Sequence, residues 1–111
     1  MTGYFELLES DTGKFRFNLK AGNHETILTS ETYESKDAAK KGIESVKMNA
    51  TLADSYDRRS AKDGAPYFVL LAGNRQVIGR SEMYSSAEAM EKGIESVRLN
   101  ASSAEIKDKT G

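Results

Sequence analysis

Apolar and polar residues alternate in short runs and then take helical spacing, and this order of patterns occurs twice along the chain. In residues 15–21, apolar side chains occupy every second position, which is the period of a strand with one buried face. Gly22, Asn23 and His24 then supply turn chemistry, and the chain returns in a second strand-forming run. The predicted strands are residues 4–9, 15–21 and 25–30 in the first copy, 55–60, 67–72 and 76–81 in the second, and 104–107 at the end.

After each hairpin the apolar spacing lengthens to that of a helix. Ser35 and Ser86 suit the N-cap position, because a serine hydroxyl accepts from an N–H group of the first turn. Each predicted helix also has a second stripe, of small residues, which contains Gly42 in the first helix and Gly93 in the second. Glycine inside a helix costs about 1 kcal/mol relative to alanine. We therefore expect a backbone, from the sheet or from the twin helix, to approach each helix closely there. The apolar stripes are Ala39, Ile43, Val46 and Ala50, and Met90, Ile94, Val97 and Ala101.

Sequence identity shows the two copies as clearly as the spacing of apolar residues does. Residues 13–50 and 64–101 are identical at 20 of 38 aligned positions. A unit of this length forms only a marginal core by itself, so the copies should share one. We expect an α+β fold over residues 1–111: one domain of two pseudo-symmetric repeats, at about 1–54 and 55–111, with one antiparallel sheet and two helices packed on one face.

The length of the hairpin loop decides which side chains face each other. A three-residue loop pairs Leu19 with Ile27 on the apolar face, whereas a two-residue loop sends Ile27 to the other face. We therefore predict the three-residue loop in both copies. Its last position requires a positive φ, and that position holds His24 or Arg75 rather than glycine.

Composition narrows the classes of function. Apolar residues make up 38% of the chain and charged residues 30%, and the formal net charge of −1 gives no overall field toward nucleic acid or an anionic membrane. The absence of cysteine excludes disulfides, thiolate catalysis and zinc–thiolate sites. No apolar run is long enough to span a bilayer and no signal-peptide core is present, so we expect a cytoplasmic protein.

The chain shows no catalytic constellation and no cofactor motif. His24 is the only histidine, and its counterpart is Arg75, which cannot act as a base at neutral pH. The glycine-rich segments match neither a P-loop nor a dinucleotide fingerprint, and no carboxylate cluster has the spacing of a calcium loop. We therefore expect no enzymatic activity, no cofactor and no metal site.

The two copies differ most on the face of each hairpin that lies opposite the predicted helices. The second copy presents Tyr67, Val69, Leu71 and Val77 there, an apolar patch, whereas the first copy presents mostly polar and basic residues. Either other parts of the molecule bury this patch, or it is exposed and marks an interface with a protein partner or a second copy. This interface is the leading hypothesis: a non-enzymatic binding module that acts through the open sheet face.

The segments just before the two predicted helices suggest a second hypothesis, because the same residues recur in both. Glu31 and Tyr33 recur as Glu82 and Tyr84. One interpretation is a duplicated pocket that binds a small molecule and could support an enzymatic reaction. The other is structural, with each tyrosine ring closing one end of the core, and we favour it because a tyrosine near a helix start commonly packs in this way.

Nucleic acid is the third and weakest hypothesis. Lys14, Arg16 and Lys20 predict a small basic strip, and Arg58, Arg59 and Lys62 add charge elsewhere. However, the net charge is close to zero, and no aromatic platform is interleaved with those lysines, as single-strand binders need. We therefore expect at most weak nucleic-acid binding, with an affinity that falls steeply with salt.

Three segments together resemble the YegP-like family of small bacterial proteins: Phe15–Asn23, Ile27–Tyr33 and Gly42–Asn49. The resemblance covers nearly the whole chain. It implies β-β-β-α-β repeats that form one antiparallel sheet with exchanged last strands, and it gives Ser55–Ser60 a double role as end strand and first strand. The resemblance informs the fold alone, because no activity is established for the family, and the function stays unknown.

The second copy departs from the family pattern at two places. Leu71 stands where the first copy has Lys20, and Gly79 and Arg80 stand where it has Leu28 and Thr29. Both departures lie on the apolar patch or beside it, which directs attention to this face of the sheet.

Overall fold

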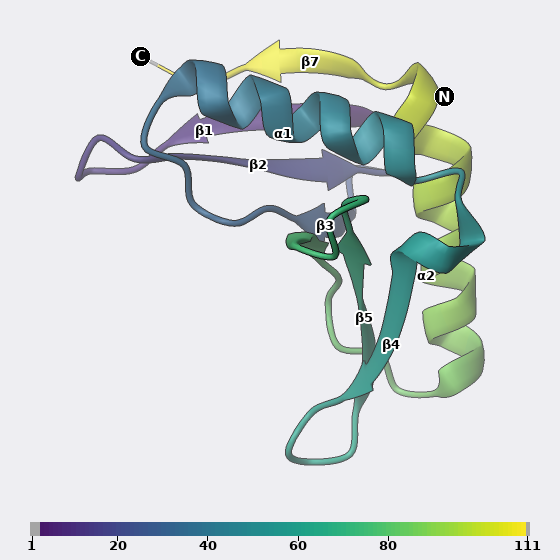
Figure 1. Ribbon diagram of the computed structural model, residues 1–111. Coiled ribbons are helices and arrows are strands. Elements are labelled where there is room, and N and C mark those ends of the chain that lie inside the picture. Colours follow the sequence, from purple (N-terminus) through teal and green to yellow (C-terminus); the bar gives the residue numbers. More distant parts are fainter. Residues whose placement is uncertain (1–2, 111) are drawn as a thin grey trace.

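Two copies of one series of elements make up the fold, as the sequence predicts, and Figure 1 shows them in a computed structural model. The structure describes residues 3–110. The strands are β1 (Tyr4–Glu9), β2 (Phe15–Lys20), β3 (Thr26–Thr29), β4 (Tyr56–Ser60), β5 (Pro66–Leu71), β6 (Val77–Arg80) and β7 (Glu105–Asp108). The helices are α1 (Lys36–Asn49) and α2 (Ala87–Asn100), followed by the 3-10 turns η1 (Ala53–Ser55) and η2 (Ala101–Ser103).

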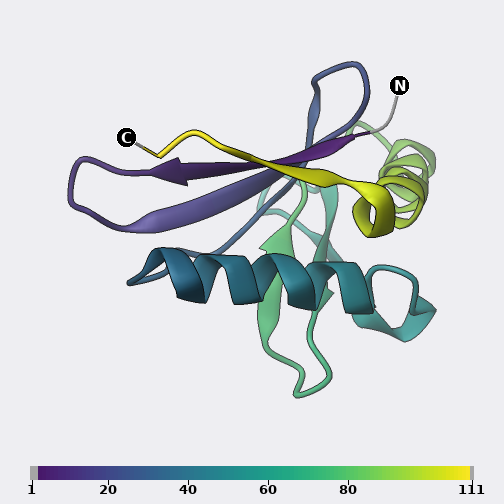
Figure 2. The same ribbon diagram turned by 90° about the horizontal axis from the view of Figure 1, so that it is seen from above.

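The strands join one 7-stranded sheet in the order β4-β5-β6-β3-β2-β1-β7. Neighbouring strands run antiparallel except at one edge, where β7 runs parallel to β1. The wholly antiparallel sheet that the sequence predicts is therefore corrected at this pair. The reason is that η2 directs the chain from α2 to the far edge of the other repeat, where it enters in the same direction as β1 (Figure 2).

The strand count reflects the double role expected for residues 55–60. Two β-β-β-α-β units that keep all their strands would form eight, but the sheet is 7-stranded because β4 is both the last strand of the first unit and the first strand of the second. The last strand of the second unit, β7, pairs with the first strand of the other repeat. The family resemblance predicts that each unit gives its last strand to the other. The second unit does so with β7, whereas the first unit has no separate last strand to exchange, because β4 serves both units.

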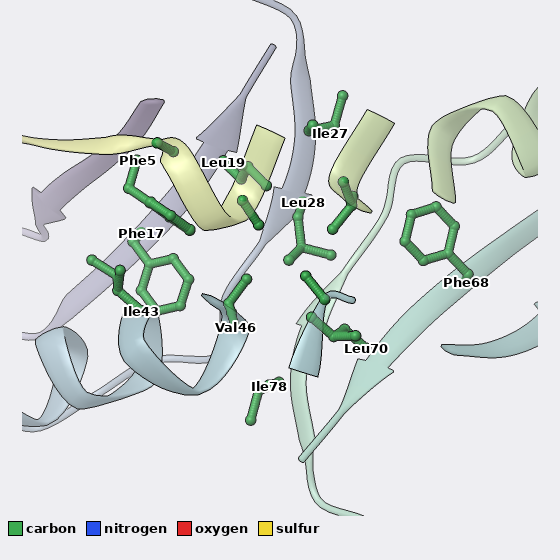
Figure 3. Packing of buried hydrophobic residues seen from close by; sticks show 14 of the residues in the cluster. Phe5, Phe17, Leu19, Ile27, Leu28, Ile43, Val46, Phe68, Leu70 and Ile78 are labelled. Atoms are coloured by element: carbon green, nitrogen blue, oxygen red, sulfur yellow. The ribbon is translucent and has the colours of Figure 1, made fainter. Parts of the chain in front are cut away.

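The junction of the two half-sheets is narrow. β3 and β6 pair only through Thr29 and Arg80, and β2 and β5 run in clearly different directions (Figure 1). Helix α1 contacts β2 of its own repeat and β5 and β6 of the other, and α2 contacts β5 and β3. Both helices therefore cross the junction and bury one core that the repeats share (Figure 3).

Both helices begin where the sequence predicts. Ser35 Oγ accepts from the Ala38 N–H at 3.0 Å, and Ser86 Oγ accepts from the Ala89 N–H at 3.1 Å. The predicted stripe residues of both helices are all buried. Neither described helix is long and apolar enough to cross a membrane.

The predicted hairpin loop is confirmed, but the predicted register is wrong. His24 and Arg75 have φ values of 71° and 69° at the last position of each three-residue loop. Beyond the loop a β-bulge shifts the pairing, so Leu19 faces Leu28 rather than Ile27. The extra residue allows Ile27 and Leu28 to be buried in succession. The bulge recurs in the second copy.

Strand β7 lies at an exposed edge. All four of its residues are exposed, and Ile106, at 38%, lies outside the buried core. The backbone holds it instead: beside the ladder with β1, the Lys109 N–H donates to the Leu7 carbonyl at 2.8 Å. The ion pair between Lys36 of α1 and Asp108 joins β7 to the helix that covers its neighbour.

Candidate functional site

Each tyrosine at the strand–helix junctions closes one end of the core. Tyr33 stacks on Phe17 with ring centroids 6.1 Å apart and planes at 12°. Tyr84 stacks on Phe68 in the same way, at 6.3 Å and 9°. Burial raises the pKa of both tyrosines, and the neighbouring glutamate of each junction adds to the rise. This geometry agrees with the structural interpretation of the two tyrosines.

The same rings explain the glycines inside the helices. A Cβ on Gly42 would overlap the Tyr33 hydroxyl and lie 2.7 Å from its Cζ. A Cβ on Gly93 would lie 2.6 Å from Tyr84 Cζ. The expectation that a sheet or twin-helix backbone comes close here is therefore wrong. An aromatic ring from the same repeat takes the space, and ring packing offsets the helix cost of glycine.

The glutamates of the two junctions, by contrast, meet in one place. Glu31 and Glu82 line a groove of about 380 Å³ at the ends of β3 and β6, where the two repeats join. Tyr33 and Tyr84 do not line it. The predicted duplicated pocket is therefore divided, with its carboxylates in a shared groove and its tyrosines on the helices. The residues that line the groove are Thr29, Ser30, Glu31, Arg80, Ser81, Glu82 and Met83.

Two serines hold the walls of this groove in place. Ser30 Oγ accepts from the Phe17 N–H at 2.9 Å and donates to the Glu31 carbonyl at 2.7 Å. Ser81 makes the equivalent bonds in the second repeat, at 2.9 and 2.8 Å. Both hydroxyls are thus engaged in the backbone, so they shape the groove and are not free nucleophiles.

The open face of the sheet follows from the strand pairing, because directly paired residues point to the same side. One row crosses both repeats through the Thr29–Arg80 pair, and none of its members belongs to the apolar set that packs under the helices. The row consists of Lys107, Glu6, Asn18, Thr29, Arg80, Val69 and Asp57. The row is polar except at Val69, which separates Arg80 from Asp57.

The predicted apolar patch lies on this open face but is only partly accessible. Val69 is 0% exposed and Leu71 is 4% exposed. Tyr67 and Val77 are half-buried. Tyr67 and Val77 therefore keep accessible surface, whereas Val69 and Leu71 are covered, although neither belongs to the core under the helices.

Arg80 is the residue that sequence analysis missed as a site candidate. Its guanidinium lies 6.0 Å from the Tyr67 ring centroid, over the half-buried tyrosine, and its side chain is exposed. Arg80 also lines the groove with Glu31 and Glu82. The patch and the groove thus meet at one residue. The signal was present in the sequence, because Arg80 is one of the positions at which the second copy departs from the first.

Cations outnumber anions on the open face, although the whole chain has a net charge of −1. Two of these cations have acidic neighbours: Lys20 Nζ lies 4.0 Å from Glu6, and Arg59 lies 3.0 Å from Asp57. The cations are Arg16, Lys20, Arg59, Arg80 and Lys107, and the anions are Glu6, Asp57 and Glu105. The face that the helices leave uncovered is therefore the more basic side of the sheet.

His24 lies at the rim of this face and has a structural contact. Its Nδ1 lies 3.0 Å from the Tyr4 hydroxyl, and the two rings meet edge to face at 5.8 Å. Within residues 3–110, no cluster of three or more histidine or acidic side chains has the geometry to hold a metal ion.

The repeat structure and the mixed sheet find direct counterparts among known proteins. The family described as "Domain of unknown function (DUF1508)" matches twice, at residues 10–57 and 61–108. The chain belongs to this family. The two family matches coincide with the two repeats, and β4 falls at their boundary.

Relatives of the DUF1508 family align over the full length. UPF0339 protein YegP of Escherichia coli (strain K12) is 51% identical over 99% of this chain and 100% of its own. A UPF0339 protein of Bordetella pertussis is 56% identical over 99% of this chain and 98% of its own. The predicted resemblance to YegP-like proteins is therefore confirmed.

Two solved family structures have the same fold. The solution NMR structure of Escherichia coli yegP, a protein of unknown function, superposes with a TM-score of 0.94 at 51% identity, covering 100% of this chain and 96% of that one. A UPF0339 protein of Shewanella oneidensis gives 0.93 at 49% identity, covering 99% and 93%. The α+β fold of two repeats is confirmed, and no specific function is established for these relatives.

Proposed function

We propose that the protein is a non-enzymatic cytoplasmic binding module whose open sheet face contacts another protein, with Arg80 and Tyr67 as the central anchors. The observation that carries the proposal is the Arg80 guanidinium, exposed and 6.0 Å over the Tyr67 ring, in the middle of the face that the helices leave uncovered. Tyrosine and arginine are among the residue types most enriched at interface hot spots.

The charge environment of Arg80 supports this role. Within residues 3–110, no carboxylate forms an ion pair with its guanidinium, whereas Arg58, Arg59 and Arg98 all have one. An exposed guanidinium stacked on an aromatic ring is oriented and keeps donors for a partner's carboxylate or carbonyl groups. The half-buried tyrosine beneath it adds apolar area at a small cost in side-chain entropy.

The first repeat supplies a natural comparison, because it lacks this pair. Arg16 and Thr29 stand at the positions of Tyr67 and Arg80. The same backbone therefore carries the stacked pair in only one of its two copies. The first repeat forms the same strands without the pair, so these strands do not need it, and its accessible position supports a role in binding.

The test is capture of proteins from a bacterial lysate on the immobilised wild type and on Arg80→Thr, which installs the residue of the first repeat. We expect at least one protein whose recovery falls about tenfold or more in the variant, as loss of a hot-spot arginine predicts. The matched control is Arg98→Thr, which removes an exposed arginine from the outer face of α2. It should leave recovery unchanged.

Equal recovery on the wild type and on Arg80→Thr would contradict the proposal, as would a lysate that yields no Arg80-dependent protein. Circular dichroism melting of both variants shows whether the fold is intact. Any Arg80-dependent protein should also lose affinity with Tyr67→Arg, because that change removes the ring under the guanidinium.

A small-molecule site is the second candidate function, and one observation favours it: Glu31, Glu82 and Arg80 line the same groove of about 380 Å³. A groove of this size with convergent charged groups has the dimensions of a ligand site. In an NMR fragment screen, amide shifts confined to residues 29–31 and 80–83 would support it. Fragments that shift only the amides of β5 would support the protein-binding face instead.

A further inference from the structure

The two outer edges of the sheet are not equivalent. Its terminal strands are β7 and β4. Strand β7 is four residues long and covers β1, the first strand of the first repeat, with a parallel ladder. Strand β4 is the equivalent first strand of the second repeat, and no strand within residues 3–110 covers its outer edge. This difference follows from the double role of β4, which leaves the second half-sheet one strand short. An uncovered strand edge presents a row of free backbone donors and acceptors.

The hydrogen-bond pattern identifies which groups are free. The Ala61 N–H donates to the Ala65 carbonyl at 2.9 Å just beyond the strand. In an antiparallel ladder, bonded and non-bonded pairs alternate, so Asp57 and Arg59 direct their backbone groups toward β5. Tyr56, Arg58 and Ser60 therefore direct theirs outward. Pro66, which has no N–H, pairs with Ser60, as a non-bonded position allows.

The first repeat shows that a strand fits at this place. Leu7 is the counterpart of Arg58, and its carbonyl accepts from the Lys109 N–H at 2.8 Å. Helix α1 covers β1 and β2 while β7 lies beside them (Figure 2). Because the repeats share one backbone design, the edge of β4 under α2 should admit a strand in the same manner.

We propose that a second copy of this chain occupies the edge, with β4 pairing antiparallel to β4 of the partner about a two-fold axis at Arg58. Charge decides the register. Asp57 and Arg59 already pair with each other within one chain, at 3.0 Å. With Arg58 opposite its own copy, each Asp57 also faces the partner's Arg59 on the open face, so the two pairs join in an alternating arrangement of four charges. The outward backbone groups of Tyr56, Arg58 and Ser60 then meet those of the partner.

The neighbouring registers are disfavoured by the same charges. A shift that centres the axis on Asp57 places two aspartates directly opposite each other, and one that centres it on Arg59 does the same with two arginines. Like charges at directly opposed positions destabilise a strand pair, whereas opposite charges stabilise it. The alternating charges of β4 thus oppose slipped pairing and permit the symmetric one.

The chosen register places Arg58 directly opposite its own copy, but each Arg58 is neutralised within its own chain. Arg58 Nε and Nη2 donate to the Glu91 carboxylate at 2.5 and 2.8 Å, in a bidentate pair on the helix side. Two such pairs meet at the axis with a total charge of zero. A dimer through the edge uses Asp57 and Arg59 of the open face but not Tyr67 or Arg80, so the proposal is independent of the proposed function.

The test is molar mass by light scattering behind a sizing column, from micromolar to millimolar protein. We expect the wild type to shift from monomer to dimer with concentration. Asp57→Arg, which places arginine opposite arginine at both ends of the interface, should raise the dimer dissociation constant about tenfold or more. The double change Asp57→Arg with Arg59→Asp restores opposite charges across the axis and should recover the dimer.

Ser60→Pro tests the backbone pairing separately, because it removes an outward N–H without removing a bond to β5, and it should also weaken the dimer. Equal melting temperatures would show that the variants fold. A wild type that stays monomeric up to millimolar concentration overturns the proposal. So does a dimer that Asp57→Arg leaves intact, or one that Arg80→Thr disrupts, since that result places the interface on the open face.

Discussion

The two repeats share their interior and differ where side chains reach the outside of the sheet. In both, a serine caps the helix, a tyrosine lies on a helix glycine and an apolar stripe is buried. On the outside, β1 is covered by β7 and β4 is not, and only the second repeat has the stacked Tyr67–Arg80 pair. Most shared positions serve folding, and the differing positions on the outside of the sheet are free to take other roles.

One difference lies inside the core, at the axis that relates the repeats. Leu28 is buried in β3, and its counterpart in β6 is Gly79. A Cβ on Gly79 would lie 2.7 Å from Leu28 Cγ and Cδ2, so two leucines do not fit at the centre. A symmetric core is therefore impossible here with a large residue in both copies, and the molecule fills the space from one side.

The largest expected effect comes from removing this leucine. Leu28→Gly leaves both central positions empty and should lower the free energy of unfolding by about 2–5 kcal/mol, through lost burial and a cavity. Gly79→Leu alone should also destabilise, by about 1–3 kcal/mol, because it overpacks the same space. Urea denaturation monitored by circular dichroism measures both changes.

The combined variant sharpens the comparison between the halves. Leu28→Gly with Gly79→Leu moves the leucine from one repeat to the other, and most of the lost stability should return. If the double variant is as unstable as the sum of the single changes, the two positions do not share one space. The coupling between neighbours in contact is what such a cycle isolates.

A medium effect is expected at the helix glycines, where the repeats agree. Gly42→Ala gains helix propensity of about 1 kcal/mol but forces the stacked Tyr33 ring to move. We expect overpacking to dominate and the free energy of unfolding to fall by about 1–2 kcal/mol. Gly93→Ala should have a similar effect through Tyr84, as thermal melting would show.

The matched control is Asn49→Ala, which changes α1 away from the ring. It removes the bond from the Asn49 amide to the Ser45 carbonyl, at 2.8 Å, and leaves Tyr33 in place. If Gly42→Ala stabilises the protein instead, the tyrosine ring moves freely and does not account for the glycine. A large difference between Gly42→Ala and Gly93→Ala would show that the repeats are less alike inside than their geometry indicates.

Sequence patterns predicted most of the framework because local chemistry determines it. Period-two and helical spacing fixed the elements, Ser35 and Ser86 marked the helix starts, and the loop with positive φ at His24 follows from loop length. The pairing of Leu19 was predicted wrongly, because a β-bulge depends on burying two successive apolar residues and leaves no periodic signal.

The candidate site was harder to predict because it depends on contacts between distant segments. Glu31 and Glu82 are distant in sequence and meet only where the half-sheets join. Tyr33 was recognised as a core residue, but the ring's position on Gly42 needs the tertiary structure. The parallel direction of β7 likewise depends on how η2 carries the chain across the other repeat, which no local pattern encodes.

The smallest expected effect concerns the covered edge, where Asp108 of β7 pairs with Lys36. Hydrogen bonds from Lys36 and Thr110 hold the pKa of Asp108 well below its ordinary value of about 3.9. Between the depressed pKa and the ordinary one, the unfolded chain binds a proton at Asp108 and the folded chain does not. The ionised Asp108 therefore contributes fully to the docking of β7 when the pH is above the ordinary pKa. This contribution is lost as the pH falls through the depressed pKa of the folded state.

Asp108→Asn should reproduce the low-pH state at neutral pH. Because the pair is exposed, we expect a local change: faster hydrogen exchange of the Lys109 amide, which bonds to the Leu7 carbonyl, at an unchanged melting temperature. The control is Glu105→Gln, because Glu105 lies on the same strand and has no ion pair within residues 3–110. Equal exchange in both variants would mean that backbone pairing alone holds β7, in which case the bare edge of β4 needs no added ion pair to accept a strand.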